Sequence, residues 1–410
     1  MKVLLISRDY TTSNIIKNAF NNIGVDLKIC LISKGEDIKA IAQKNEDIIC
    51  MLDNLDIDNI CYNIKNVEIK FNYIFTNDEL LIDKIKIIAN RINSKCVQDH
   101  ISTSRNKLDF KKLIKKSQIK TPKFEVIYNK SDLNNLDIYL PCVVKPIDGF
   151  SSNGVEVVKD KKRLQKAINS VFVQNSLKSV LYGDQSEGCI IEEYIDGKEY
   201  SVDIIWNNSV AVDTIICSRI QNDLVHCPDY LYFIDPKIDK DLELLLIENA
   251  INIGKAYNII HGSTHTEFKV KNNIAYVIDN AVRPGGGGII YYMFDKFYKT
   301  NVLENFCKSM CEIKSTKTVI KNTNGKEYPF LMFYTNRKKG KFLKLDFDFS
   351  HPNLTITEII KPTKRGDKIP DPKMMIIYMF YIFGYAKANS FQEFTNQIKL
   401  LDKEIKIQYY

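Results

Sequence analysis

The sequence predicts an α/β protein built from more than one domain, and three observations support this prediction. Short apolar runs alternate with polar helical stretches through the first hundred residues. Further strand-like runs flank loops rich in glycine and serine, and a run of four glycines at 285–288 follows a strand. The length of 410 residues favours two to four domains over one.

The first domain, residues 1–103, is expected to be a small unit with a mainly parallel sheet. Its expected strands lie at 3–7, 27–32, 48–51 and 73–76, with helices at 12–23 and 80–91. No Gly-x-Gly-x-x-Gly motif follows the first strand. The pattern therefore argues against a dinucleotide-binding fold.

The second domain is expected at 104–313. Its expected elements are a basic helix at 104–117, strands at 139–145, 155–159, 189–194, 200–206 and 209–218, and helices at 161–170 and 242–257. A hairpin with Asn272-Asn273 at its turn is expected to join strands at 264–271 and 273–282. A helix should then run to about residue 313. A polar linker at 314–326 precedes a separate, small third domain at 327–410, which is expected to be α/β or β-rich.

Composition excludes several classes of protein. The net charge is +8, but lysines alternate with acidic residues and no block of five basic residues occurs, so a solvated surface is favoured over a nucleic-acid face. The ten cysteines form no Cys-x-x-Cys pair, which argues against a zinc site and for a reducing compartment. The longest apolar stretch, residues 374–383, is too short to cross a bilayer. We expect a soluble, cytoplasmic protein without nucleic-acid or membrane partners.

The first segment with chemical potential begins at Lys145, which ends an apolar strand. A loop of small residues follows, including Ser151, Ser152 and Gly154, and a second strand then resumes. Small residues let backbone N–H groups approach phosphate oxygens, and a lysine supplies charge. A plain hairpin with a long tip explains the same pattern equally well, and the loop is not a Walker A motif.

The second segment is acidic. Glu192 and Glu193 end a strand, and Glu199 begins the next one after a turn. An adenine needs a backbone donor and acceptor on an extended segment, and a ribose diol needs a carboxylate a few residues later. Glu199 fits the ribose role, although an exposed acidic hairpin accounts for the segment as well.

The third segment gives the strongest signal. Glu267 lies on one strand of the hairpin and Asp279 on the other, and the latter is followed by Arg283 and by the glycine run. Two carboxylates on adjacent strands can share one or two hard cations that bridge ATP phosphates. An arginine can neutralise charge on a transferred phosphoryl group, and exposed backbone N–H groups can hold an oxyanion. A flexible linker is the alternative for the glycines, but their place between a strand and a helix favours function.

In this order and at these separations, the three segments resemble an ATP-grasp enzyme from about residue 104 to 310. The closer resemblance is to the L-amino acid ligase branch, which includes dipeptide synthetases. That branch has similar His-x-Glu-Phe and Arg-x-Gly-Gly-Gly motifs, seen here at 265–268 and 283–287. The final piece, with Gly366-Asp367-Lys368-Ile369, also resembles the small last domain of that branch. The resemblance implies an ATP-grasp fold with an N-terminal α/β domain, a lid subdomain at roughly 120–195 and a small C-terminal domain.

The resemblance also implies roles for individual residues. The residues that the resemblance implies as nucleotide contacts are Lys107, Lys145, Ser151, Ser152, Gly154, Glu192, Glu193, Ile195 and Glu199. Among them Glu192, Glu193 and Ile195 correspond to the adenine hinge and Glu199 to the ribose ligand. Glu267 and Asp279 correspond to the magnesium carboxylates, and Arg283 to the arginine that stabilises an acyl phosphate.

Three positions depart from the usual pattern. Asn106 replaces the usual Asp before Lys107, and the second metal carboxylate is Asp279 rather than Glu. Ala281 stands where Asn is usual, two residues after the second carboxylate. Either one metal is held more loosely, or a bulged strand lets Asn280 serve, or activity is weakened.

The implied function is ATP-dependent, ADP-forming carboxylate–amine ligation through an acyl phosphate, with Mg²⁺ (or Mn²⁺) and small-molecule substrates that include an amino acid. His265 is a candidate general base and His261 a structural histidine. The region 218–232, with Arg219 and His226, either lines the acceptor pocket or is a surface excursion. A carboxylase, a ligase for another acid, and a nucleotide-binding protein with weakened catalysis remain alternatives. A homodimer is a further expectation from the superfamily.

Overall fold

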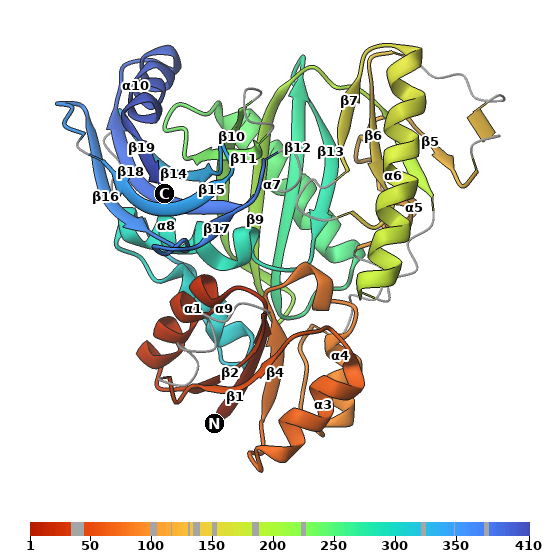
Figure 1. Ribbon diagram of the computed structural model, residues 1–410, viewed down its shortest axis with the longest axis vertical. Helices are drawn as coiled ribbons and strands as arrows, with labels where there is room; N and C mark the ends of the chain where they lie inside the picture. Colours follow the sequence, from red (N-terminus) through yellow and green to blue (C-terminus); the bar gives the residue numbers. More distant parts are fainter. Residues whose placement is uncertain are drawn as a thin grey trace.

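The computed structural model describes residues 1–33, 45–98, 105–115, 117–129, 132–133, 140–149, 154–182, 188–222, 227–320, 325–347, 349–372 and 377–410. Within these residues the strands form four sheets. In Figure 1 the N-terminal unit lies below a long central sheet, and a smaller sheet with its covering helix lies beside one edge of that sheet. Among the described helices, none is long and apolar enough to cross a membrane.

The N-terminal unit has the parallel sheet that the sequence predicts. Its strand order is β3-β2-β1-β4, and its strands are β1 (Lys2–Ser7), β2 (Asp26–Ile32), β3 (Ile48–Leu52) and β4 (Tyr73–Thr76). Its helices are α1 (Tyr10–Asn22), α3 (Ile57–Asn66) and α4 (Ile85–Arg91). The helix expected at 80–91 is instead a 3₁₀ turn, η1 (Glu79–Leu81), followed by α4. Asp78 caps the turn by accepting a hydrogen bond from the backbone N–H of Leu80.

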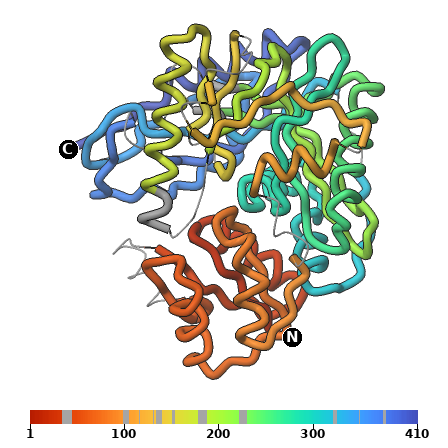
Figure 2. The backbone as a smooth tube through the Cα atoms, turned by 90° about the vertical axis from the view of Figure 1, so that its right-hand side faces the viewer, coloured from red at the N-terminus to blue at the C-terminus, as the bar shows by residue number. Residues whose placement is uncertain are grey.

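The lid region forms a four-stranded antiparallel sheet with the order β5-β8-β6-β7. Its strands are β5 (Phe124–Ile127), β6 (Cys142–Pro146), β7 (Glu156–Val158) and β8 (Cys189–Glu193). The flanking helices are α5 (Lys107–Ile114) and α6 (Lys161–Tyr182), and α6 is longer than the expected 161–170. Figure 2 shows α6 and this sheet above the N-terminal unit.

The central sheet has eight strands in the order β13-β12-β9-β10-β11-β14-β18-β16. Its strands are β9 (Lys198–Asn207), β10 (Val210–Asn222), β11 (Cys227–Phe233), β12 (Gly262–Lys271), β13 (Ile274–Ala281), β14 (Glu327–Thr335), β16 (Leu354–Ile360) and β18 (Tyr378–Lys387). Helix α7 (Lys240–Ala256) packs on β9 and buries Leu246, Ala250 and Ile253 against Trp206. The hairpin β12–β13 turns at Asn272 and Asn273, which both have positive φ, as an Asn-Asn type I′ turn requires.

Two helices, rather than the single one expected, follow the glycine run. The run itself is a 3₁₀ segment, η3 (Gly285–Gly288), and leads into α8 (Ile289–Tyr298) and α9 (Val302–Ser309). Lys299 has a left-handed backbone that ends α8. Asp295 then accepts hydrogen bonds from the N–H groups of Val302 and Leu303, which fixes the start of α9.

The C-terminal residues contribute strands to two sheets. β14 pairs with β11 through Leu231 opposite Met332, so the central sheet continues past residue 327. The reason is that β11 and β14 both bury aromatic residues on two faces. A small three-stranded sheet of β15 (Gly340–Asp346), β17 (Lys368–Ile369) and β19 (Lys406–Tyr409), with helix α10 (Phe391–Glu404), completes the chain. The expected domain boundaries stay predictions.

Candidate active site

A cavity of about 1240 Å³ brings most of the expected site residues together. Its walls come from the N-terminal unit, the lid sheet and the central sheet. Among the residues expected from the sequence, it is lined by Lys107, Lys145, Glu192, Glu193, Ile195, Glu199, His265, Glu267, Asp279 and Arg283. Ser151, Ser152 and His226 lie outside the described residues.

Gly154 does not line this cavity in the structure. Its φ is +79°, and a Cβ there would lie 2.4 Å from Oε1 of Gln174 and 3.1 Å from Pro146. A glycine is therefore required for close packing on α6 and for the left-handed backbone. Contact between Gly154 and a phosphate stays a prediction.

Lys145 lies at the end of β6 and is almost fully buried. Its Nζ is 2.8 Å from Oε2 of Glu192 and donates a hydrogen bond of 2.9 Å to the carbonyl oxygen of Ile278. Nζ of Lys111, on α5, is 2.7 Å from the other oxygen of Glu192. Burial would raise the pKa of Glu192, but the charges of Lys145 and Lys111 hold it below its usual value.

This lysine pair changes the interpretation of Glu192. Its side chain balances two buried cations and does not extend along the hinge as a free carboxylate. The backbone of the next residues corresponds to the expected hinge. The N–H of Glu193 donates a hydrogen bond to the carbonyl oxygen of Lys123, and the N–H of Tyr194 donates one to the carbonyl oxygen of Pro141. Within the described part of the chain, the N–H of Ile195 makes no hydrogen bond, and Ile195 lines the cavity. That N–H is suited to an adenine edge.

Glu199 lies at the start of β9, where the sequence predicts a ribose ligand. Nη1 of Arg219, on β10, is 2.9 Å from its Oε1, and Nζ of Lys269 is 3.5 Å from its Oε2. Nη1 of Arg219 is also 2.8 Å from Oε1 of Glu267, and its guanidinium lies over the ring of Tyr232. Arg219 therefore connects the expected ribose ligand to the expected metal ligand.

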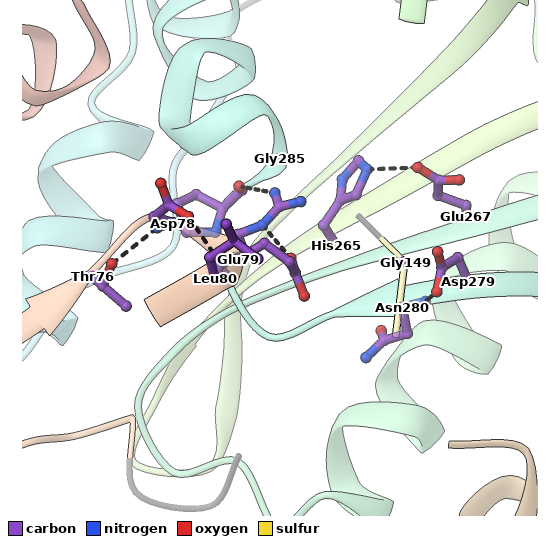
Figure 3. Close-up of polar contacts among 12 residues, drawn as sticks. Thr76, Asp78, Glu79, Leu80, Gly149, His265, Glu267, Asp279, Asn280 and Gly285 are labelled. Carbon is purple, nitrogen blue, oxygen red and sulfur yellow. Dashed lines mark hydrogen bonds and ion pairs between the residues drawn. The ribbon is translucent and has the colours of Figure 1, made fainter. Parts of the chain in front are cut away.

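Glu267 and Asp279 lie opposite one another on β12 and β13 and point to the same face of the sheet. Oδ2 of Asp279 is 3.1 Å from Nζ of Lys107, which also donates to the carbonyl oxygen of Gly149. Figure 3 shows His265 pointing toward Glu267, with Nε2 at 3.5 Å from Oε1, and Asp279 nearby. The two expected metal carboxylates thus meet three basic side chains, Lys107, Arg219 and His265.

A bulge occurs in β13, and Asn280 lines the cavity, but its side-chain oxygen is already bonded within the hairpin. The register shifts at Ile278, between the pairs Glu267–Asp279 and Phe268–Val277. Asn280 lies opposite Thr266, on the other face, and its Oδ1 accepts a hydrogen bond of 2.8 Å from that threonine. Ala281 also lines the cavity, and its methyl group offers no ligand oxygen at the position where Asn is usual.

His265 lies between two carboxylates. Its Nδ1 is 2.8 Å from Oδ2 of Asp203, and the other oxygen of Asp203 accepts a hydrogen bond from the N–H of Gly285. Burial lowers the pKa of His265, but Asp203 and then Glu267 raise it to about 9. The imidazolium is therefore the favoured form at neutral pH, which suits binding of negative charge better than the general-base role expected from the sequence.

Sequence reasoning missed Asp203 and Glu79. Asp203 follows Glu199 by four residues on β9, and this even spacing on a strand places both on one face. No motif in the sequence pointed to Glu79, because it lies in the N-terminal unit, far along the chain from the other site residues. Its carboxylate forms an ion pair with Arg283, whose Nη1 also donates to the carbonyl oxygen of Pro284.

The donor set fits Mg²⁺. Glu267 and Asp279 offer carboxylate oxygens from paired strands beside Lys107 and Lys145, where phosphates would lie. Among the residues described, no group of three His, Cys, Asp or Glu side chains is close enough to hold a metal without other ligands. Magnesium usually takes one or two carboxylates, keeps waters and completes its shell with substrate phosphates. Two carboxylates are therefore a sufficient protein contribution.

Residues 138–290 match the model of the ATP-grasp domain family. This part of the chain is similar to that family. A D-alanine–D-alanine ligase from Helicobacter pylori is 30% identical over 234 residues, which cover 54% of this chain and 61% of that relative. The similarity therefore spans less than two thirds of the relative's length.

Solved structures confirm the expected ATP-grasp fold over the whole chain. An L-amino acid ligase from Bacillus licheniformis superposes with a TM-score of 0.81 at 19% identity, covering 100% of this chain and 99% of that one. A biotin carboxylase complex from Campylobacter jejuni superposes with a TM-score of 0.69 at 16% identity, covering 99% of this chain and 92% of that one. At these identities the likeness establishes the fold, and the activity must be argued from the site.

Proposed function

We propose that this ATP-grasp protein is an ATP-dependent carboxylate–amine ligase that acts on an amino acid. One observation carries the proposal: a single cavity joins the buried lysines, the carboxylates Glu267 and Asp279, and Arg283. The similarity to ligases of amino acids in sequence and in structure supports it. Mg²⁺ or Mn²⁺ as cofactor, a cytoplasmic location and a homodimer remain parts of this proposal.

The reaction would have two steps. An oxygen of the substrate carboxylate attacks the γ-phosphorus of ATP, and ADP leaves. The nitrogen of a neutral amine then attacks the acyl carbon and loses a proton, and inorganic phosphate leaves as the amide forms. Lys107, Lys145 and Arg283 would reduce the repulsion between the carboxylate and the phosphates. A bound Mg²⁺ would supply further charge neutralisation at the phosphates.

The glycine run and His265 would act on the oxyanion formed when the amine attacks. Asp203 fixes both groups through its two oxygens, so they move little relative to one another. Such preorganised donors are effective because they need no reorientation during the reaction.

The test is to incubate the protein with ATP, Mg²⁺ and pairs of amino acids, and to measure ADP, inorganic phosphate and amide product. ADP and phosphate should appear in equal amounts with the amide. ADP formation with bicarbonate alone would contradict the proposal and support a carboxylase. ATP binding without turnover for any acid would support the second candidate, a nucleotide-binding protein with weakened catalysis, which Ala281 motivates.

A further inference from the structure

The cavity extends beyond the residues that ATP and metal would use. This second end is lined by Asp9 and Thr12 from the N-terminal unit, by Gly286 and Gly287, and by the aromatic residues Tyr232, Phe333, Tyr378 and Tyr381. The side chain of Asn77 donates hydrogen bonds of 3.0 Å to Thr12 and 3.1 Å to the carbonyl oxygen of Gly287. These contacts hold the N-terminal unit against the glycine run, next to Arg283.

The charges at this end do not cancel. Arg8 makes a two-point ion pair with Asp78, at 2.6 and 2.9 Å, and Arg283 pairs with Glu79. Asp9 is different: one of its oxygens accepts a hydrogen bond of 2.8 Å from the N–H of Thr11. Within the described ranges, no lysine, arginine or histidine pairs with Asp9. Its carboxyl group therefore has no cationic partner in the described cavity wall. Burial raises the pKa of Asp9 above its usual value, although Thr11 and Thr12 donate hydrogen bonds to it.

Three of the aromatic rings form a continuous wall. The ring of Phe333 lies 5.2 Å from that of Tyr378 and 5.4 Å from that of Tyr381, centroid to centroid. Tyr381 is more than nine-tenths buried, yet its hydroxyl makes no hydrogen bond to any described residue, and the residue lines the cavity. Burial raises the pKa of Tyr381, and the charge of Asp9 raises it further, so the two groups are electrostatic neighbours.

We propose that this end is a subsite for the ammonium group of the amino-acid substrate, which Asp9 and the Tyr381 hydroxyl bind while the carbon skeleton lies on the rings of Phe333, Tyr378 and Tyr381. A carboxylate next to aromatic faces suits an ammonium cation, because both attract positive charge. An apolar or aromatic side chain on the substrate would bury its surface against the same rings. The inference rests on the proposed function and names the substrate class of the same cavity.

The carboxylate of Asp9 and the hydroxyl of Tyr381 can each be removed by a substitution that keeps nearly the same side-chain shape. Asp9→Asn removes the charge but keeps the helix cap, since Asn and Asp cap helices equally well. Tyr381→Phe removes only the hydroxyl. Asp56→Asn is the matched control, because Asp56 caps α3 in the same way, by accepting from the N–H of Asn59, and lies away from the cavity.

The experiment is calorimetric titration of the full chain, loaded with Mg²⁺ and a non-hydrolysable ATP analogue. The probes are L-phenylalanine and L-leucine, compared with 3-phenylpropanoate and 4-methylpentanoate, which lack the amino group. The unaltered protein should bind the amino acids at least about tenfold more tightly than the amine-free acids. Asp9→Asn should remove this preference, Tyr381→Phe should reduce it, and Asp56→Asn should keep it.

Equal binding of both kinds of acid, no binding of either amino acid, or a full preference in Asp9→Asn would each overturn the inference. Its failure is distinct from failure of the proposed function. Amide formation that is insensitive to Asp9→Asn would leave the ligase standing without this subsite. An ammonium preference that Asp9→Asn removes, in a protein that releases no ADP, would leave the subsite standing without the ligase.

Discussion

Glu79 forms an ion pair with Arg283, although the two residues are 204 positions apart in the chain. The pair ties the N-terminal unit to the strand end that precedes the glycine run. A partly buried arginine with a fixed partner is oriented before any substrate arrives, and its charge is available where the phosphoryl group would be transferred.

The first prediction concerns Arg283. Arg283→Lys should lower kcat for ADP formation about 100-fold or more, because lysine cannot reproduce the planar set of donors. The affinity for ATP should change little. Glu79→Gln, which keeps an oxygen acceptor for Arg283, is the control and should lower kcat much less. An unchanged kcat in Arg283→Lys would remove Arg283 from the chemical step.

The second prediction separates binding from stability at Lys145. Lys145→Ala should weaken ATP binding about tenfold or more, measured by calorimetry, because it removes a charge-assisted contact to phosphate. Lys111→Met is the matched control: Lys111 binds the other oxygen of Glu192 but does not line the cavity. Both variants should lower the free energy of unfolding. If the two weaken ATP binding equally, Lys145 acts only through the fold.

The third prediction concerns the metal. Ala281→Asn should lower the half-saturating concentration of Mg²⁺ severalfold, because it adds a ligand oxygen on the cavity face. Asn280→Ala should leave that concentration unchanged and lower the free energy of unfolding by about 1 kcal/mol, since it removes the bond from Thr266 on the opposite face. A changed Mg²⁺ requirement in Asn280→Ala would mean that the side chain of Asn280 serves the metal.

The fourth prediction is a pH dependence at His261. Burial lowers its pKa below the usual value of about 6.5, so the folded state binds the proton less well than the unfolded state. The free energy of unfolding should therefore fall as the pH drops below about 6.5, and less so in His261→Asn. Urea unfolding at pH 7 and pH 5 measures the difference. Equal losses in both proteins would contradict the assignment.

The fifth prediction tests the packing behind the site. A Cβ at Gly254 would lie 2.1 Å from the indole of Trp206, so Gly254→Ala should lower the free energy of unfolding by about 1–3 kcal/mol. Gly325, where a Cβ would meet nothing within 4 Å, provides the neutral control as Gly325→Ala. Thermal unfolding of both variants measures the two stability losses. A stability loss at Gly325 that matches the loss at Gly254 would refute the packing argument.

The sequence predicted the site where its signals are local. The hairpin turn at Asn272 and Asn273 depends on two residues that tolerate positive φ, and that hairpin brings Glu267 and Asp279 onto adjacent strands. The lysine at the end of β6 and the carboxylate at the start of β9 followed from the same strand boundaries. These inferences need only neighbouring residues.

The remaining features depend on contacts between distant segments. Nothing near Glu79 indicates that it meets Arg283, and nothing near Glu192 indicates that it lies between Lys111 and Lys145. The orientation of Asn280 depended on the position of a bulge, which a one-residue change in register decides. The pairing of β11 with β14 joins segments separated by α7, the β12–β13 hairpin, α8 and α9, so periodicity alone could not predict it.

That pairing of β11 with β14 has a practical consequence for protein engineering. The rings proposed to recognise a substrate side chain and the carboxylates proposed to bind metal lie on one uninterrupted hydrogen-bonded surface. A chimera joined before residue 327 would have to re-form the main-chain hydrogen bonds between β11 and β14. Imperfect pairing there would expose a strand edge prone to aggregation. Altered selectivity is therefore better sought by replacing individual side chains on β14 and β18 than by exchanging the whole C-terminal segment.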